Sequence, residues 1–172
     1  MDGYVPDEAV PDFFAALKKG NVHTIDTARL YAGSEVRIGN TPGHEDFIID
    51  TKLIGGFAPG TVKKEAIIAD SLDSLERVKI KQFDILYIHS PDITIPLEEQ
   101  LEGINEVYKK GIFKRFGLSN FTAEQVQEVY DLAKSKGYVL PSVFQGNYSP
   151  VARHLETLLF PTLRKLGIAF YA

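Results

Sequence analysis

The sequence predicts an α/β fold built from about six parallel βα units. Short apolar runs rich in β-formers alternate with helical patterns along the whole chain, as parallel βα units require. The starts of these runs recur about every 25 to 37 residues, which is the size of a βαβ repeat. No low-complexity segment or linker divides the chain, so we expect a single domain over residues 1–172.

Six apolar runs are predicted to be strands. They cover Val22–Asp26, Phe47–Lys52, Asp84–His89, Arg115–Leu118, Ser142–Gly146 and Ile168–Tyr171. Ahead of the first strand, a helix is expected near Asp7 to Lys19.

Apolar residues between the strands recur at helical spacing and predict one apolar face for each helix. The three clearest sets are Ile68, Leu72, Leu75 and Val78; Leu101, Ile104 and Tyr108; and Val126, Val129, Tyr130 and Ala133.

Turn and capping residues predict where the helices begin and end. Gly20, Gly111, Gly137 and Gly167 follow lysine-containing helix ends, where a left-handed residue is favoured. Thr122 with Gln125 predicts a capping box, and Pro161 predicts a kink or break in the last helix.

Composition excludes several classes of partner. The formal net charge of -4 gives no basic surface for nucleic acid or an anionic membrane. The chain has no cysteine, so disulfides are excluded. The segment MDGYVPDEAVPDFF does not resemble a signal peptide, and no apolar run could span a bilayer. We therefore expect a cytoplasmic protein with no membrane partner, no nucleic-acid partner and no metal site.

Polar residues follow five consecutive predicted strands. Asp26, Lys52, His89, Ser119, Asn120 and Gln145 each lie at or just after a strand's carboxyl end. Barrel enzymes place their chemistry at this edge, whereas an open doubly wound sheet gathers it near one switch point. No G-x-G-x-x-G follows any strand. An incomplete (β/α)8 TIM barrel is therefore favoured, although its full form needs about 250 residues.

Asp26, Tyr31, Lys52 and His89 could together protonate an oxyanion. A lysine ammonium beside a phenol lowers the phenol pKa from about 10, so Lys52 would tune Tyr31. Asp26 would hold the lysine charged and in position. A neutral His89 could donate a hydrogen bond to a carbonyl oxygen that gains negative charge. A hydride would have to come from another source, because no side chain supplies one.

Each of these residues also has an ordinary structural explanation. Asp26 would serve as a strand-end cap, Lys52 as a solvated lysine, His89 as a hydrogen-bonded structural histidine and Tyr31 as a surface aromatic. Ser119, Asn120 and Gln145 would be turn or capping groups. The chemical interpretation is favoured over these structural ones because all seven residues occur together, in one order along the chain.

Five ordered motifs resemble the aldo-keto reductases over nearly the whole chain. They are DTARLY from Asp26, FIIDTK, LYIHSPD, GLSN and FQGNYSP. ILPSVFQGNYSP, ETLLFPTLRKLG and the terminal FYA resemble the aflatoxin-aldehyde reductase branch.

The resemblance implies residue roles and a cofactor. It implies that Asp26, Tyr31, Lys52 and His89 form a catalytic tetrad, and that Ser119, Asn120 and Gln145 hold the nicotinamide carboxamide. The implied reaction is the NADPH-dependent reduction of an aldehyde or ketone, a small-molecule carbonyl substrate.

The chain also departs from that family. It opens in the first barrel helix and stops in the seventh strand, so the first and last barrel strands and the segment that binds the 2′-phosphate are expected to be missing. Three functions stay open: a reductase, a shortened barrel that has lost NADPH and acts as a binding module, and a cofactor-independent isomerase. A homo-oligomer that completes the open edges of the barrel is a further expectation.

Overall fold

The computed structural model describes residues 6–172. Part of the segment in which we expect no signal peptide, residues 1–5, lies outside this range. Within residues 6–172, no helix is both long and apolar enough to cross a membrane.

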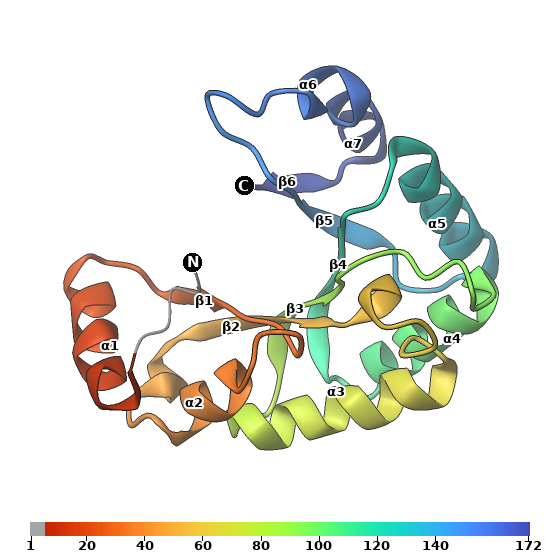
Figure 1. The fold of residues 1–172 in the computed structure, drawn as a ribbon. Coiled ribbons are helices and arrows are strands. Elements are labelled where there is room, and N and C mark those ends of the chain that lie inside the picture. The colour runs from red at the N-terminus through yellow and green to blue at the C-terminus, as the bar shows by residue number, and fades with distance from the viewer. Residues whose placement is uncertain (1–5) are drawn as a thin grey trace.

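Six parallel strands form one sheet in the order β1-β2-β3-β4-β5-β6, so each strand pairs with the next along the chain. The strands are β1 (Thr24–Asp26), β2 (Ile48–Leu53), β3 (Phe83–Ile88), β4 (Phe113–Ser119), β5 (Pro141–Gln145) and β6 (Ala169–Tyr171). All six predicted strands are confirmed, with ends displaced by at most two residues. Figure 1 shows that the sheet curls into an arc, with β1 and β6 on the two sides of its opening. The incomplete barrel is thereby confirmed.

The helices lie along the outer side of this arc (Figure 1). They are α1 (Val10–Lys19), α2 (Ser34–Asn40), α3 (Lys64–Val78), α4 (Leu97–Lys109), α5 (Ala123–Lys136), α6 (Leu155–Leu158) and α7 (Phe160–Leu166), with short 3-10 turns η1 (Asp7–Ala9), η2 (His44–Asp46) and η3 (Gly55–Phe57). The expected N-terminal helix is α1 together with η1. The break expected at Pro161 falls between α6 and α7, and α7 carries the proline in its first turn. The capping box of Thr122 and Gln125 is present.

The main hydrophobic core lies between the sheet and these helices. Strand residues such as Leu86, Phe116 and Phe144 pack there with helix residues such as Ile104 and Val129. On the inner side of the arc, a separate small cluster consists of Ile85, Tyr87 and Val143. The alternation along each strand thus divides the sheet into an apolar outer face and a second face free for polar groups.

Three details of the helix predictions are wrong. Tyr108, expected on the apolar face of α4, is 40% exposed. On α3, Leu72 is 45% exposed, and the fully buried positions are Ile67, Ser71, Ser74 and Val78. Ser74 is covered by the Arg29 guanidinium, which lies against this side of α3 and donates to Ser74 Oγ at 2.9 Å.

At the end of α1, Gly20 has a φ of -81°, and the left-handed position falls on Asn21 instead. The turn that leaves α1 is therefore one residue longer than predicted. Gly111, Gly137 and Gly167 do have positive φ, as predicted.

Candidate active site

The carboxyl ends of the strands bring the predicted tetrad residues to one edge of the sheet. Asp26 ends β1, Lys52 lies near the end of β2, and His89 directly follows β3. Tyr31 lies in the turn between β1 and α2. We call this edge the mouth. It is the edge at which barrel enzymes carry their chemistry.

Lys52 is fully buried and bonded to two oxygen atoms. Its Nζ donates to Asp26 Oδ2 at 2.5 Å and to the Thr27 carbonyl oxygen at 2.8 Å. The Asp26 side chain is 37% exposed, whereas that of Lys52 is not exposed at all. Burial lowers the pKa of Lys52, and the neighbouring Asp26 carboxylate opposes that effect. The predicted pairing of these two residues is present.

Tyr31 lies between Lys52 and His89. The Lys52 Nζ is 5.2 Å from the centre of the Tyr31 ring, and the Tyr31 and His89 rings meet edge to face at 5.7 Å between centroids. The expected lowering of the Tyr31 pKa is wrong. Burial raises the pKa of Tyr31, and the Asp26 charge adds to this effect. Lys52, which was expected to lower this pKa, is bonded to Asp26 and lies over the ring of Tyr31.

His89 is buried, and its pKa is lowered to about 4, first by burial and then by the Lys52 cation. At neutral pH its imidazole is therefore uncharged, as predicted, and has one N–H to donate. Its backbone is tied on both sides: its N–H donates to the Leu53 carbonyl oxygen at 3.0 Å, and its carbonyl oxygen accepts from Asn120 Nδ2 at 2.8 Å. These bonds fix the residue between β2 and β4.

Arg29 anchors the turn that carries Tyr31, a role that the sequence did not predict. Its Nη1 donates to the Asp70 carbonyl oxygen and to Asp73 Oδ2, both at 2.9 Å. Its Nη2 donates to Asp70 Oδ1 at 3.0 Å. Its backbone N–H donates to the Lys52 carbonyl oxygen at 3.1 Å. The turn is thereby held against both α3 and β2. The sequence did contain a signal for this role, because Arg29 lies two residues before Tyr31 in the motif DTARLY.

Ser119, Asn120 and Gln145 lie at the mouth on β4 and β5. Ser119 and Gln145 are register partners on these neighbouring strands. Asn120, with a φ of +62°, donates through Nδ2 to Ser119 Oγ at 3.2 Å as well as to His89. Gln145 Nε2 donates to Asp26 Oδ1 at 3.1 Å, which links β5 to β1 across the arc. All seven predicted site residues are thus connected at one edge.

The chemistry of these three side chains fits a primary carboxamide. Asn120 and Gln145 use their amide N–H groups within the protein, so their side-chain oxygens can accept from an amide NH2. The Ser119 hydroxyl accepts from Asn120 and keeps its own proton to donate to an amide oxygen. A nicotinamide carboxamide needs this combination of donor and acceptors.

Further polar residues lie on the inner face, away from the mouth. Asp50 is two residues before Lys52 on β2, and its Oδ1 accepts from the Ile85 N–H at 3.0 Å. Burial raises the pKa of Asp50 to about 6. Arg115 pairs with Asp84 and donates to the Tyr171 hydroxyl at 3.1 Å. The sequence did not predict this group, because only the strand register brings its members together.

A curled sheet of parallel βα units with acid-base side chains at its carboxyl edge defines a barrel enzyme of the (β/α)8 class, here with six of its strands. The model of the aldo/keto reductase family matches residues 2–172. The chain belongs to the aldo/keto reductase family.

Named relatives agree with this family. The chain is 40% identical to Oxidoreductase sirO of Leptosphaeria maculans over 99% of its own length and 52% of the relative. It is 39% identical to Aflatoxin B1 aldehyde reductase member 2 of Homo sapiens over 92% of its length and 45% of the relative. The crystal structure of the thermostable aldo-keto reductase Tm1743 superposes with a TM-score of 0.84 at 25% identity, covering 97% of this chain and 60% of that one. The chain spans about half the length of the curated relatives it matches.

Proposed function

We propose that this protein reduces an aldehyde or ketone to an alcohol with NADPH as the reductant. One observation supports this above all: the Tyr31 ring lies beside a neutral His89 and next to the buried Lys52–Asp26 pair. When bound, NADPH supplies the hydride, which no side chain can supply. We propose that Ser119, Asn120 and Gln145 hold its carboxamide.

His89 would polarise the substrate. Its uncharged imidazole donates a hydrogen bond to the carbonyl oxygen, on which negative charge grows as the carbonyl carbon becomes tetrahedral. A fixed donor needs little reorganisation, and the backbone bonds from Leu53 and Asn120 supply that rigidity.

Tyr31 would donate the proton that converts the oxyanion into the alcohol. The raised pKa of Tyr31 keeps the phenol protonated at neutral pH, so a proton is available when the oxyanion forms. The O–H bond of Tyr31 breaks as the new O–H bond of the alcohol forms. Solvent, which reaches the 43% exposed Tyr31, then returns a proton to the phenolate.

The substitution Tyr31→Phe tests this proposal. Turnover of an aldehyde should fall about 10²- to 10⁴-fold, the usual contribution of a proton donor. NADPH affinity, measured by nicotinamide fluorescence, should hardly change because only the hydroxyl group is lost. Tyr108→Phe is a matched control, since Tyr108 is 40% exposed on α4, on the outer side of the arc. Wild-type turnover in the Tyr31 variant would remove this residue from the mechanism.

A further inference from the structure

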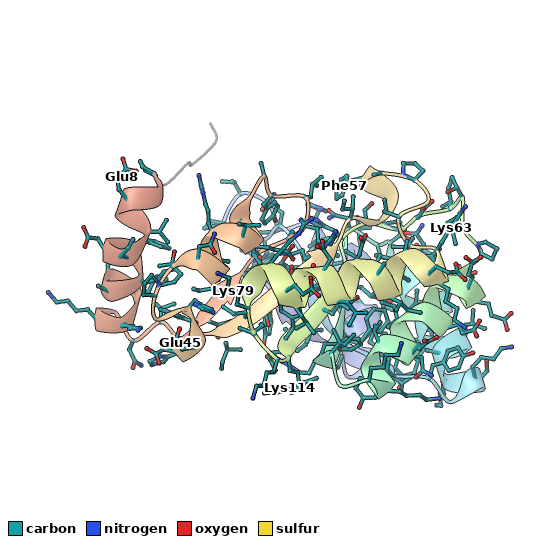
Figure 2. The ribbon with its side chains drawn as sticks, turned by 90° about the horizontal axis from the view of Figure 1, so that it is seen from below. Glu8, Glu45, Phe57, Lys63, Lys79 and Lys114 are labelled. Atoms are coloured by element: carbon teal, nitrogen blue, oxygen red, sulfur yellow. The ribbon has the colours of Figure 1, made fainter. Side chains whose placement is uncertain are left out.

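A cavity of about 450 Å³ lies at the edge of the sheet where the strands begin, and its volume falls within the range of small-molecule sites, about 300–1,000 Å³. Its wall comes from η2, the starts of β2, β3 and β4, and the turn between α3 and β3. In Figure 2, Glu45 and Lys114 of this wall lie on the edge of the molecule opposite Phe57, whose ring meets His89 at the mouth. We call this space the basal cavity. It is separate from the candidate active site.

Three lysine side chains line the basal cavity. Lys79, Lys81 and Lys114 are all exposed. Lys79 Nζ donates to Asn40 Oδ1 at 2.7 Å, and within residues 6–172 the other two form no hydrogen bond or ion pair. Because an ammonium group has three donors, most of the donors around this cavity are free to bind a ligand.

The two carboxylates of the wall do not cancel this positive charge. Asp84 is paired with Arg115, which lies outside the wall. Glu45 has His44 as its partner, with 3.3 Å between Glu45 Oε2 and His44 Nδ1, and its side chain is 68% exposed. Three ammonium groups therefore outweigh one carboxylate that no lysine or arginine neutralises. In a chain with a formal net charge of -4, the basal cavity is a local positive region that attracts anions.

Lys79 has a backbone conformation that lysine seldom adopts. It ends α3 with a φ of 58°. The left-handed residue after α4, α5 and α7 is a glycine in each case, namely Gly111, Gly137 and Gly167. The other non-glycine residues with positive φ in residues 6–172 are asparagines, which accept this region more readily. Strained residues cluster at functional sites. A glycine here would relieve the strain but would remove one of the three ammonium groups.

The basal cavity also offers apolar area to a ligand. Ile48 is 48% exposed at the start of β2, and Ile80 is partly buried in the turn after α3. An inorganic anion would leave this area in water, whereas an anion with an organic group would cover it. A phosphate monoester carries about −1.5 to −2 charges at pH 7 and has three acceptor oxygens, which suits three ammonium groups.

We propose that the basal cavity binds an organic phosphate monoester. Lys79, Lys81 and Lys114 hold the phosphate group, and the organic group covers Ile48. The site lies away from the mouth, so the inference does not depend on the proposed reductase function.

The test titrates the protein with phenyl phosphate and follows the chemical shifts of the backbone amides. The shifts of residues 79–82 and of Lys114 should saturate, and the Kd should rise with added salt, which screens exposed charges beyond about 10 Å at 0.1 M. Lys79→Gly should raise the Kd about two- to fivefold, the effect of one exposed ion pair. Lys63→Gly is the matched control and should leave the Kd unchanged. Lys63 is an exposed lysine at the other end of α3 (Figure 2), at a helix start where glycine is also tolerated.

Thermal unfolding without ligand tests the strain at Lys79. Lys79→Gly should unfold at a midpoint no lower than that of the wild type, because glycine accepts a positive φ. A lower midpoint would show that Lys79 serves stability through its bond to Asn40, and would overturn the proposal.

Three binding results would also overturn it: no saturable shift, an unchanged Kd in Lys79→Gly, or an equal loss in Lys63→Gly. Inorganic phosphate should bind more weakly than phenyl phosphate, because it leaves Ile48 uncovered. Equal affinities for the two would refute the organic part of the ligand.

Discussion

The Lys52–Asp26 ion pair should respond very differently to the loss of each partner. Asp26→Asn removes the negative charge beside a buried ammonium group, which keeps only uncharged oxygen partners such as the Thr27 carbonyl oxygen. Lys52→Met leaves a carboxylate whose side chain is 37% exposed and can be hydrated. Both substitutions remove the ion pair, yet only the first creates an uncompensated buried charge.

The magnitudes follow from that asymmetry. Asp26→Asn should lower the free energy of unfolding by about 3–5 kcal/mol at pH 7, the cost of removing one partner from a buried pair. Lys52→Met should cost about 1–3 kcal/mol, because the buried Thr27 carbonyl oxygen loses its donor. In the double variant no buried cation remains, so its stability should approach that of Lys52→Met alone.

The pH dependence adds a second check. Burial already lowers the pKa of Lys52, and removing Asp26 takes away the interaction that opposes this effect. Between the folded pKa and the unfolded value of 10.5, the unfolded chain binds more protons, so stability rises with pH. The deficit of Asp26→Asn should therefore shrink as the pH rises from 7 toward 10.5.

Urea unfolding of the three variants at pH 7 and at a series of higher pH values up to 10.5 measures these differences. Equal losses for the two single variants, or a larger loss for Lys52→Met, would refute the reasoning. A double variant as unstable as Asp26→Asn would also contradict it, because the buried charge would then not be the cause.

Four further outcomes are expected. Gly117→Ala should lower the stability by about 1–3 kcal/mol in thermal unfolding, because its Cβ would lie 2.3 Å from Tyr87 Cδ1; an unchanged midpoint would show that the ring moves freely. Ser71→Ala should be neutral or stabilising by up to about 1 kcal/mol, since the buried Ser71 Oγ has no hydrogen-bond partner among residues 6–172; a clear loss would reveal a partner. Because the pKa of His89 is lowered from 6.5 to about 4, the contribution of its neutral form to the free energy of unfolding is fully present above pH 6.5 and is lost as the pH falls through 4. His89→Gln should therefore weaken the dependence of the free energy of unfolding on pH in this acidic range, as measured by urea titrations. A preparation of residues 1–172 should not run as a monomer of 19.2 kDa in light scattering, because β1 and β6 each have an edge without a neighbour in the described part of the chain; a well-folded monomer would contradict this.

The strand positions and the placing of the site residues could be predicted from the sequence. Lys52 and His89 each close an apolar run of strand length, and parallel strands align such ends at one edge. Thr122 and Gln125 likewise define a helix start through local hydrogen bonds alone. These features depend on residues that lie close together in the sequence.

Features that depend on distant partners could not be predicted. The buried side of α3 includes Ser74, since Arg29, more than forty positions earlier, lies against it. The direction of the Tyr31 pKa depends on the burial of its side chain and on the nearby Asp26 charge, neither of which a motif specifies. The contact of Phe57 with His89 requires the close approach of two loops.

The sequential order of the strands makes the sheet a nearly one-dimensional array, in which each unit is stabilised mainly by its immediate neighbours. Such arrays open from their ends, so amide exchange should be slowest in β3 and β4 and fastest in the terminal units. Asp26 belongs to a terminal unit, whereas His89 directly follows a central one. The two halves of the acid-base site thus differ in local stability. Because the Gln145–Asp26 hydrogen bond joins β5 to β1, local opening of β1 should also destabilise the end of β5.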